Sequence, residues 1–235
     1  MLKEKRSAFH HSWNLPPQKA IELQIELARK VIRKSCIHIG SIETVAGIDT
    51  SYRSNMACAA VVVLNLKNLE LIEYKTAILP IEFPYIPGLL SFREGPAIIK
   101  AMQKLKTQPD ILLFDGQGIA HQRRFGIASH IGLLLDRPSI GCAKNRLIGN
   151  YQEPDVRRGF FTDLLEGNAT IGAVVRTRTG IKPVFVSSGH RINLRDSIKL
   201  VLDCNKGFRL PEPIRWADRL SRETVQRFSV QRFRG

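Results

Sequence analysis

The sequence predicts an α/β domain built on a mixed central sheet that is flanked by helices. Two observations predict it: three consecutive strand-like runs have short connections, and short apolar runs then alternate with helical segments. The short connections favour antiparallel pairing of the first three strands, and parallel strands are expected to follow. Three antiparallel strands, then helix, strand, helix and strand, is the order of a ribonuclease-H-like fold. That topology does not by itself establish catalysis.

The elements of the first half follow from spacing. A first helix is expected between Pro16-Pro17 and Gly40, because apolar residues recur at four-residue spacing along one face. The middle strand-like run is apolar throughout from Ala59 to Leu64, as expected for a strand covered on both faces. The three expected strands cover residues 44–52, 56–66 and 69–78.

The second half begins with a loop rich in proline and glycine, residues 80–88. A helix is expected over 92–106, with its true first turn at Gly95-Pro96. The other expected elements are a buried strand at 110–115, a helix at 123–135, strands at 138–143, 169–178 and 183–187, and a helix at 194–202. The chain has no repeat or low-complexity linker. We therefore expect a loosely ordered basic leader, residues 1–15, and one domain from residue 16 to 235.

The composition favours a polyanionic partner. Lys and Arg number 36 against 21 Asp and Glu, a formal net charge of +15, and such an excess binds phosphates with release of counterions. The alternative is a basic protein surface with no role in nucleic-acid binding. The four cysteines are scattered, and no run approaches the ~20 apolar residues of a membrane span. We expect a cytoplasmic protein with no membrane association, monomeric because no dedicated interface is identifiable.

Two acids end apolar strand-like runs. Asp49 follows Val45-Ala46-Gly47-Ile48, and Asp115 follows Ile111-Leu112-Leu113-Phe114. A buried strand-end acid is costly unless it is paired, hydrogen-bonded or metal-bound. If the first and fourth strands are neighbours, the two carboxylates converge and suit Mg²⁺. The alternative makes each acid a turn or cap residue, and Glu94 alone is explained by a first helical turn.

Several long motifs, in order, resemble the endonuclease V family. The two longest are PYIPGLLSFREGP (84–96) and FDGQGIAHQRRFGIASHIG (114–132). The others are AGIDTSY (46–52), GCAKNRL (141–147), SSGHRI (187–192) and RLPEPIRWAD (209–218). The resemblance extends from about the first helix to residue 218.

The resemblance implies a ribonuclease-H-like DNA repair enzyme that uses Mg²⁺, with Mn²⁺ as a substitute. It would hydrolyse the second phosphodiester bond 3′ to deoxyinosine, leaving 5′-phosphate and 3′-hydroxyl ends. Asp49, Glu94 and Asp115 match the family's metal site. Lys144 would position the scissile phosphate or stabilise developing charge. His190 matches an active-site histidine. The implied partners are DNA with deoxyinosine or other deaminated bases, and inosine-containing RNA.

The resemblance also implies a strand-separating wedge and a pocket for the displaced base. The wedge is Pro84, Tyr85, Ile86 and Pro87. Two prolines fix the loop, so that the tyrosine can project and offset the cost of unstacking a base. The alternative is a rigid surface turn whose tyrosine packs on the domain. Glycines suit a pocket because a base can approach their backbone closely; the implied pocket residues are Gly88, Leu90, Gly116, His121, Gly126 and Ile127.

Two other functions stay open at this point. The same chemistry could act on inosine-containing RNA, since tolerance of a 2′-hydroxyl is not readable from the sequence. A non-catalytic nucleic-acid-binding protein on the same fold would explain the charge without a metal. It would leave Asp49 and Asp115 as strand-end acids with no evident partner, and substituting both would then leave function intact.

Overall fold

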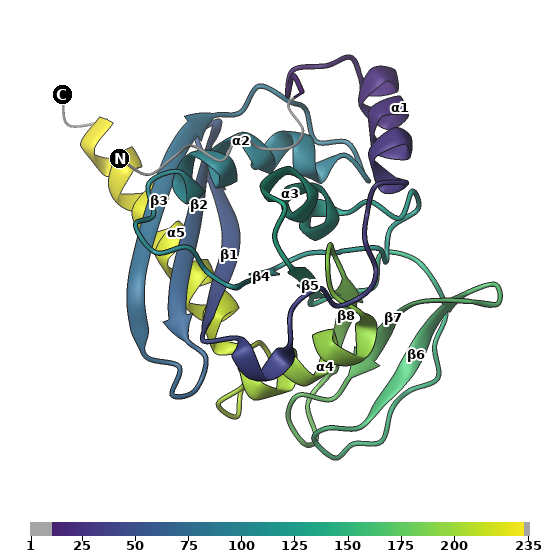
Figure 1. Cartoon of the computed structure of the whole chain (residues 1–235). Coiled ribbons are helices and arrows are strands. Elements are labelled where there is room, and N and C mark those ends of the chain that lie inside the picture. The colour runs from purple at the N-terminus through teal and green to yellow at the C-terminus, as the bar shows by residue number, and fades with distance from the viewer. Residues whose placement is uncertain (1–10, 233–235) are drawn as a thin grey trace.

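Eight strands form one mixed sheet in the computed structural model, which describes residues 11–232 (Figure 1). The order across the sheet is β3-β2-β1-β4-β5-β8-β7-β6. Strands β1 to β3 pair antiparallel, and β1, β4 and β5 pair parallel. The strands are β1 Thr44–Arg53, β2 Met56–Asn65, β3 Leu71–Pro80, β4 Ile111–Phe114, β5 Ser139–Ala143, β6 Phe161–Glu166, β7 Ala169–Val175 and β8 Val184–Ser188.

The half of the sheet beyond β5 differs from the expectation of parallel strands. Strands β8, β7 and β6 are each antiparallel to their neighbours. Only the β1–β4–β5 core is parallel, because a helix connects β4 to β5, whereas a two-residue turn joins β6 to β7. Strand β6 was not expected from the sequence. Most of its residues are exposed or half-buried, so it lacks the apolar run of a covered strand.

The first helix is shorter than expected. The helices are α1 Pro17–Ala28, η1 Ile39–Ser41, α2 Leu90–Met102, α3 Ile127–Leu135, α4 Leu194–Asp203 and α5 Glu212–Arg232. The expected end of the first helix at Gly40 is wrong, because the segment after Ala28 pairs with a distant loop instead. The Arg191 N–H donates to the Ile32 carbonyl, and the Cys36 N–H donates to the Arg191 carbonyl.

The expected first turn of the second helix is also wrong. Helix α2 begins at Leu90, five residues before Gly95, and contains Pro96. A proline inside a helix lacks one backbone N–H, a loss that surrounding packing can outweigh. Gly95 makes room for the Trp13 ring, whose atoms lie 2.4 Å from where a Cβ would stand. The packing of Trp13 thus covers this stretch of α2, and residues 11–15 lie on the body of the domain.

The helices form a layer on each face of the sheet (Figure 1). Alternate residues of β1 point to opposite faces: Ala46 and Ile48 pack with the cluster that includes α2 and α3 residues, and Val45 packs with the cluster that includes α4 and α5 residues. Helix α5 lies so close to β1 that a Cβ on Gly47 would stand 2.0 Å from the Pro213 carbonyl oxygen. This contact fixes the C-terminal helix against the strand that carries Asp49.

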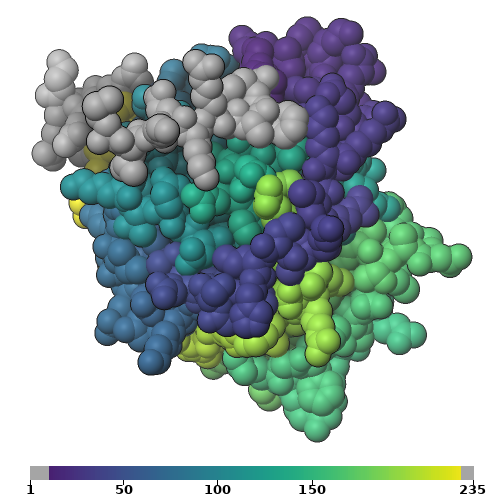
Figure 2. Space-filling model, in the orientation of Figure 1, coloured from purple at the N-terminus to yellow at the C-terminus, as the bar shows by residue number. Residues whose placement is uncertain are grey.

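Figure 2 shows the N-terminal part of the described chain lying across the surface of later segments, and the β6–β7 hairpin at one side. The basic leader expected at residues 1–15 falls mostly outside the described residues, which begin at 11. Among the helices of the described chain, none is long and apolar enough to cross a bilayer.

Candidate active site

Three carboxylates converge where β1, β4 and α5 meet. Asp49, Asp115 and Asp218 each offer an oxygen, and these oxygens lie within 4.8 Å of one another. The expectation that the first and fourth strands are neighbours is confirmed: β1 pairs parallel with β4, and the Asp115 N–H donates to the Ile48 carbonyl at 3.0 Å. Asp49 and Asp115 are therefore brought together by the sheet itself, and α5 adds Asp218.

The three acids carry a concentrated negative charge. Burial, followed by the charges of Asp115 and Asp218, raises the pKa of Asp49 to about 7 although Lys144 lowers it. Two cations offset part of this charge. The Lys144 ammonium lies 2.6 Å from Asp115 and 3.8 Å from Asp218, and the Arg222 guanidinium lies 2.9 Å from Asp218. Partial burial lowers the pKa of Lys144, but Asp115, Asp218 and Asp49 together outweigh it and the pKa is raised.

Glu94 lies on α2, next to the three-aspartate cluster but outside it. It is almost fully buried and accepts a hydrogen bond from the Tyr52 hydroxyl of β1. Burial raises the pKa of Glu94 to about 8; the Tyr52 hydrogen bond lowers it, and the charges of Asp49 and Asp115 raise it. Glu94 is not among the acids whose oxygens lie within 4.8 Å of one another. This geometry suits a carboxylate that acts beside the three-aspartate cluster.

A buried serine orients Asp49. The Ser221 hydroxyl of α5 can donate its one proton to Asp49 Oδ2 at 3.2 Å or to the Asp218 carbonyl at 3.0 Å, and it lies 2.7 Å from the Ser51 hydroxyl. Ser221 is fully buried. One helix therefore presents both the third carboxylate and a polar contact to the first.

The Pro84–Pro87 loop holds one aromatic ring out in solvent. Tyr85 is 70% exposed, whereas Phe83 and Leu89 on either side of the loop are buried. The Phe83 ring packs on Phe92 with centroids 5.5 Å apart, and Arg93 donates to the Phe83 carbonyl at 2.8 Å. A surface turn whose tyrosine packs on the domain does not describe this geometry. The ring is free to contact a ligand.

The Gly88 carbonyl at the end of that loop is held by three donors. They are Gln24 Nε2 at 3.1 Å, His121 Nε2 at 3.0 Å and Arg123 Nη2 at 2.7 Å. Burial, followed by the charge of Arg123, lowers the pKa of His121 to about 4, so the ring is neutral near pH 7. Because His121 Nδ1 accepts from the Arg123 N–H at 3.2 Å, the proton lies on Nε2.

Three of the other expected pocket residues lie together between β4 and α3. A Cβ on Gly116 would stand 2.7 Å from the Ile127 side chain, and one on Gly126 would stand 2.4 Å from the Gln117 carbonyl oxygen. Leu90 is the first residue of α2. Gln117 is buried, and its side-chain oxygen has no hydrogen-bond partner among the described residues. The glycines thus allow close backbone packing beside a free acceptor.

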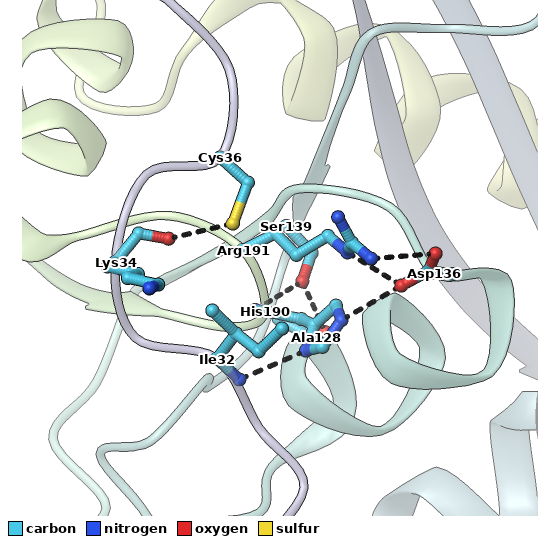
Figure 3. A network of polar contacts seen from close by, with 8 residues as sticks. All are labelled: Ile32, Lys34, Cys36, Ala128, Asp136, Ser139, His190 and Arg191. Atoms are coloured by element: carbon cyan, nitrogen blue, oxygen red, sulfur yellow. Dashed lines mark hydrogen bonds and ion pairs between the residues drawn. The ribbon is translucent and has the colours of Figure 1, made fainter.

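His190 lies in a polar network that does not include the three clustered aspartates (Figure 3). The His190 ring has Nε2 3.4 Å from Asp136, and its Nδ1 accepts from the Ile32 N–H at 3.3 Å. The backbone N–H of His190 donates to the Ser139 hydroxyl. Arg191 pairs with the same Asp136 at 2.6 Å. Burial lowers the pKa of His190 more than Asp136 raises it. These contacts join His190 to the segment after α1, and the active-site place that the resemblance implies for it stays a prediction.

Comparison with known proteins assigns the family. The endonuclease V family model matches residues 25–219. Endonuclease V of Methanothrix thermoacetophila is 50% identical over 211 residues, which are 90% of this chain and 93% of that protein. The chain belongs to the endonuclease V family. Its resemblance to that family, and its ribonuclease-H-like fold, are confirmed, and the chain is a nuclease.

Solved structures of endonuclease V agree with this assignment. The Streptomyces avermitilis enzyme superposes with a TM-score of 0.89 at 38% identity, covering 93% of this chain and 96% of that one. Endonuclease V of Ciona intestinalis superposes with a TM-score of 0.80 at 29% identity, covering 90% of this chain and 98% of that one. The Ciona protein was crystallised with a 24-mer DNA that contains an inosine followed by a ribo-adenosine.

Asp218 is the site residue that sequence reasoning did not assign. It ends the endonuclease V motif RLPEPIRWAD, but no apolar strand marks it. A signal was present in the helical spacing of α5, where Ile214, Ala217, Ser221 and Val225 form the buried face. Asp218 adjoins that face, so an amphipathic helix placed there would have predicted a third acid directed at the sheet.

Proposed function

We propose that this endonuclease V hydrolyses the second phosphodiester bond 3′ to deoxyinosine with Mg²⁺, leaving 5′-phosphate and 3′-hydroxyl ends. The observation that carries the proposal is the convergence of Asp49, Asp115 and Asp218 next to Lys144. The inosine-containing DNA bound by the Ciona relative supports the choice of lesion. The protein acts as a monomer, and its substrates extend to DNA with other deaminated bases.

The three acids fit a divalent metal. Carboxylate oxygens are the ligands that Mg²⁺ prefers, and Mn²⁺ accepts the same set. Burial and then the charges of Asp115 and Asp218 raise the pKa of Asp49, and a cation would neutralise those charges. Asp49, Asp115 and Asp218 would hold the ion, with Glu94 beside it. The chemistry supplied at these acids by the bound ion is charge stabilisation of the phosphate and orientation of the attacking water.

Lys144 and the exposed loop have separate tasks. The Lys144 ammonium contacts Asp115, and from this position it stabilises negative charge that develops on the scissile phosphate. Tyr85 projects from a loop anchored at both ends, so it fills the place of a displaced base without a large ordering cost. The displaced hypoxanthine enters beside Gly88, Gly116 and Gly126.

Inosine-containing RNA is a second candidate substrate. The specific observation is that the Ciona relative binds an inosine followed by a ribonucleotide. The aspartates and Lys144 act on phosphate oxygens, which both polymers share, so the same site serves a strand with a 2′-hydroxyl.

The experiment is a gel assay with end-labelled duplexes carrying one deoxyinosine, a matched adenine duplex and the corresponding inosine RNA, each with Mg²⁺ or EDTA. We expect a Mg²⁺-dependent nick one nucleotide beyond the lesion, lost in Asp49→Asn and Asp115→Asn. Asp203→Asn is the matched control, because Asp203 is exposed and pairs with Lys199 on α4. Cleavage that persists in both site variants would refute the proposed metal site. Cleavage of the RNA alone would show that inosine-containing RNA, and not DNA, is the substrate.

A further inference from the structure

We propose that a cavity between β1 and α5 binds the backbone phosphate that lies 3′ to the scissile one. This inference rests on the proposed function for its direction along the strand. The cavity has a volume of about 330 Å³, at the lower end of the range for ligand sites. Its lining residues are Thr50, Ser51, Tyr52, Arg53, Arg222, Val225 and Gln226.

The chemistry of the lining favours an anion. Two arginines, Arg53 and Arg222, and Gln226 line it together with three hydroxyl residues and one valine, and the lining contains no carboxylate residue. Arg53 is exposed at the end of β1, and it has no carboxylate within ion-pair distance among the described residues. Arg53 thus brings an unpaired guanidinium to the lining, and a phosphate in the cavity would accept hydrogen bonds from it and from Arg222, whose charge Asp218 already pairs.

The position of the cavity connects it to the acids. Thr50 directly follows Asp49, and Arg222 lies one helical turn after Asp218 and pairs with it at 2.9 Å. An anion in the cavity would therefore be the immediate neighbour of the group bound at the acids. Because a nucleic-acid strand carries a phosphate at every nucleotide, a second backbone phosphate fits this neighbouring cavity better than a free small molecule.

The direction follows from the order of sites across the molecule. The proposed base pocket contains Gly116 and Gly126, on the β4–α3 side of the acids. The cavity lies on the other side, between β1 and α5. A strand that starts in the base pocket and crosses the acids thus reaches the cavity last. Since the proposed cut is 3′ to the lesion, the phosphate in the cavity is on the 3′ side of the cut.

The first test measures binding without cleavage. Fluorescence anisotropy of a labelled deoxyinosine duplex in EDTA, over a series of KCl concentrations, compares wild type with Arg53→Gln. We expect the slope of log K against log salt to become shallower by about 0.9, the value for one phosphate contact. Arg219→Gln is the matched control: its side chain is 71% exposed on the same helix and pairs with Glu223. An unchanged slope in Arg53→Gln, or an equal change in the control, would overturn the subsite.

The second test locates the phosphate. Single methylphosphonates, which are uncharged, replace each phosphate on both sides of the expected cut. In wild type, we expect one replacement on the 3′ side to weaken binding roughly tenfold, the loss of a charge-assisted hydrogen bond. Arg53→Gln should be nearly insensitive to that replacement, and Arg222→Gln should share the insensitivity. The inference is contradicted if the replacement to which Arg53→Gln is insensitive lies on the 5′ side of the cut. It is also contradicted if every replacement weakens binding equally in wild type and in both variants.

Binding and cleavage separate the two proposals. If the protein fails to nick inosine duplexes with Mg²⁺ but Arg53→Gln still loses one phosphate contact, the proposed function fails and the anion subsite stands. If it nicks as proposed and Arg53→Gln binds like wild type, only the subsite fails. Thermal melting of Arg53→Gln checks folding, and we expect no shift because the side chain is exposed.

Discussion

Asp218 gives the site a carboxylate that comes from a helix, whereas the other two come from adjacent strands. We predict that Asp218→Asn lowers Mg²⁺ affinity by at least about 100-fold. Substituting a residue that only hydrogen-bonds a metal ligand already lowers metal affinity about 10–100-fold. Nicking should fall in parallel at limiting Mg²⁺. Isothermal titration with Mn²⁺ measures the affinity directly, and a normal melting temperature would show that the fold persists. Unchanged affinity would remove Asp218 from the metal site.

The raised pKa values of Asp49 and Glu94 predict how metal-free stability depends on pH. Both are higher in the folded state, about 7 and about 8, so folding holds protons that the unfolded chain releases near pH 4. The stabilisation is complete below pH 4 and is lost as pH rises through 7 and 8. We expect the melting temperature in EDTA to fall between pH 6.5 and 8.5, and Mg²⁺ to raise it more at pH 8.5. Asp49→Asn should flatten the fall; a steady melting temperature would contradict the shifts.

At the scale of elements, the docking of α5 on β1 depends on Gly47. A Cβ there would overlap the backbone of Pro213, which cannot rotate away. We predict that Gly47→Ala destabilises the protein by about 1–3 kcal/mol, as overpacking does, and weakens metal binding because Asp218 moves with the helix. Gly40→Ala is the control, since its Cβ would meet only the exposed His38 ring. Denaturant titration measures both; equal stability of the two variants would contradict the docking argument.

The Pro84–Pro87 loop permits a prediction that separates strand opening from chemistry. Tyr85→Ala removes the exposed ring and leaves the buried anchors Phe83 and Leu89 in place. We expect slower nicking of a deoxyinosine duplex and near-normal nicking of a single strand, where no base pair has to be opened. The ratio of the two single-turnover rates is the readout. An equal loss on both substrates would mean that the loop does not act as a wedge.

At the scale of the whole molecule, the continuous sheet predicts one folding unit from residue 16 onward. One buried cluster contains residues of β1, β2, β4, β5, β7, β8, α4 and α5. A core that crosses from one sheet edge toward the other should melt as a unit. We expect a single calorimetric transition, with the calorimetric and van't Hoff enthalpies equal. Two resolved transitions would indicate that the β6–β8 half folds separately.

The sequence predicted those parts of the fold whose signal is local. Asp49 and Asp115 were found because each ends an apolar run, and their convergence followed from strand order. Helix α5 was missed because its buried face includes Ser221 and small residues, and its partner is Gly47, far away in the chain. The helix end at Ala28 depends on backbone pairing with a distant loop. Such long-range contacts leave no periodic pattern for a sequence to show.

The late position of α5 bears on when the protein can begin to cut. A ribosome makes Asp49 and Asp115 early, but Asp218 belongs to a helix that starts at residue 212 and docks across the strand made first. While that helix is still in the exit tunnel, the nascent chain has its basic surface and two of its three aspartates. The third carboxylate joins the other two only when that helix docks on β1, so the three-aspartate site is completed late in folding.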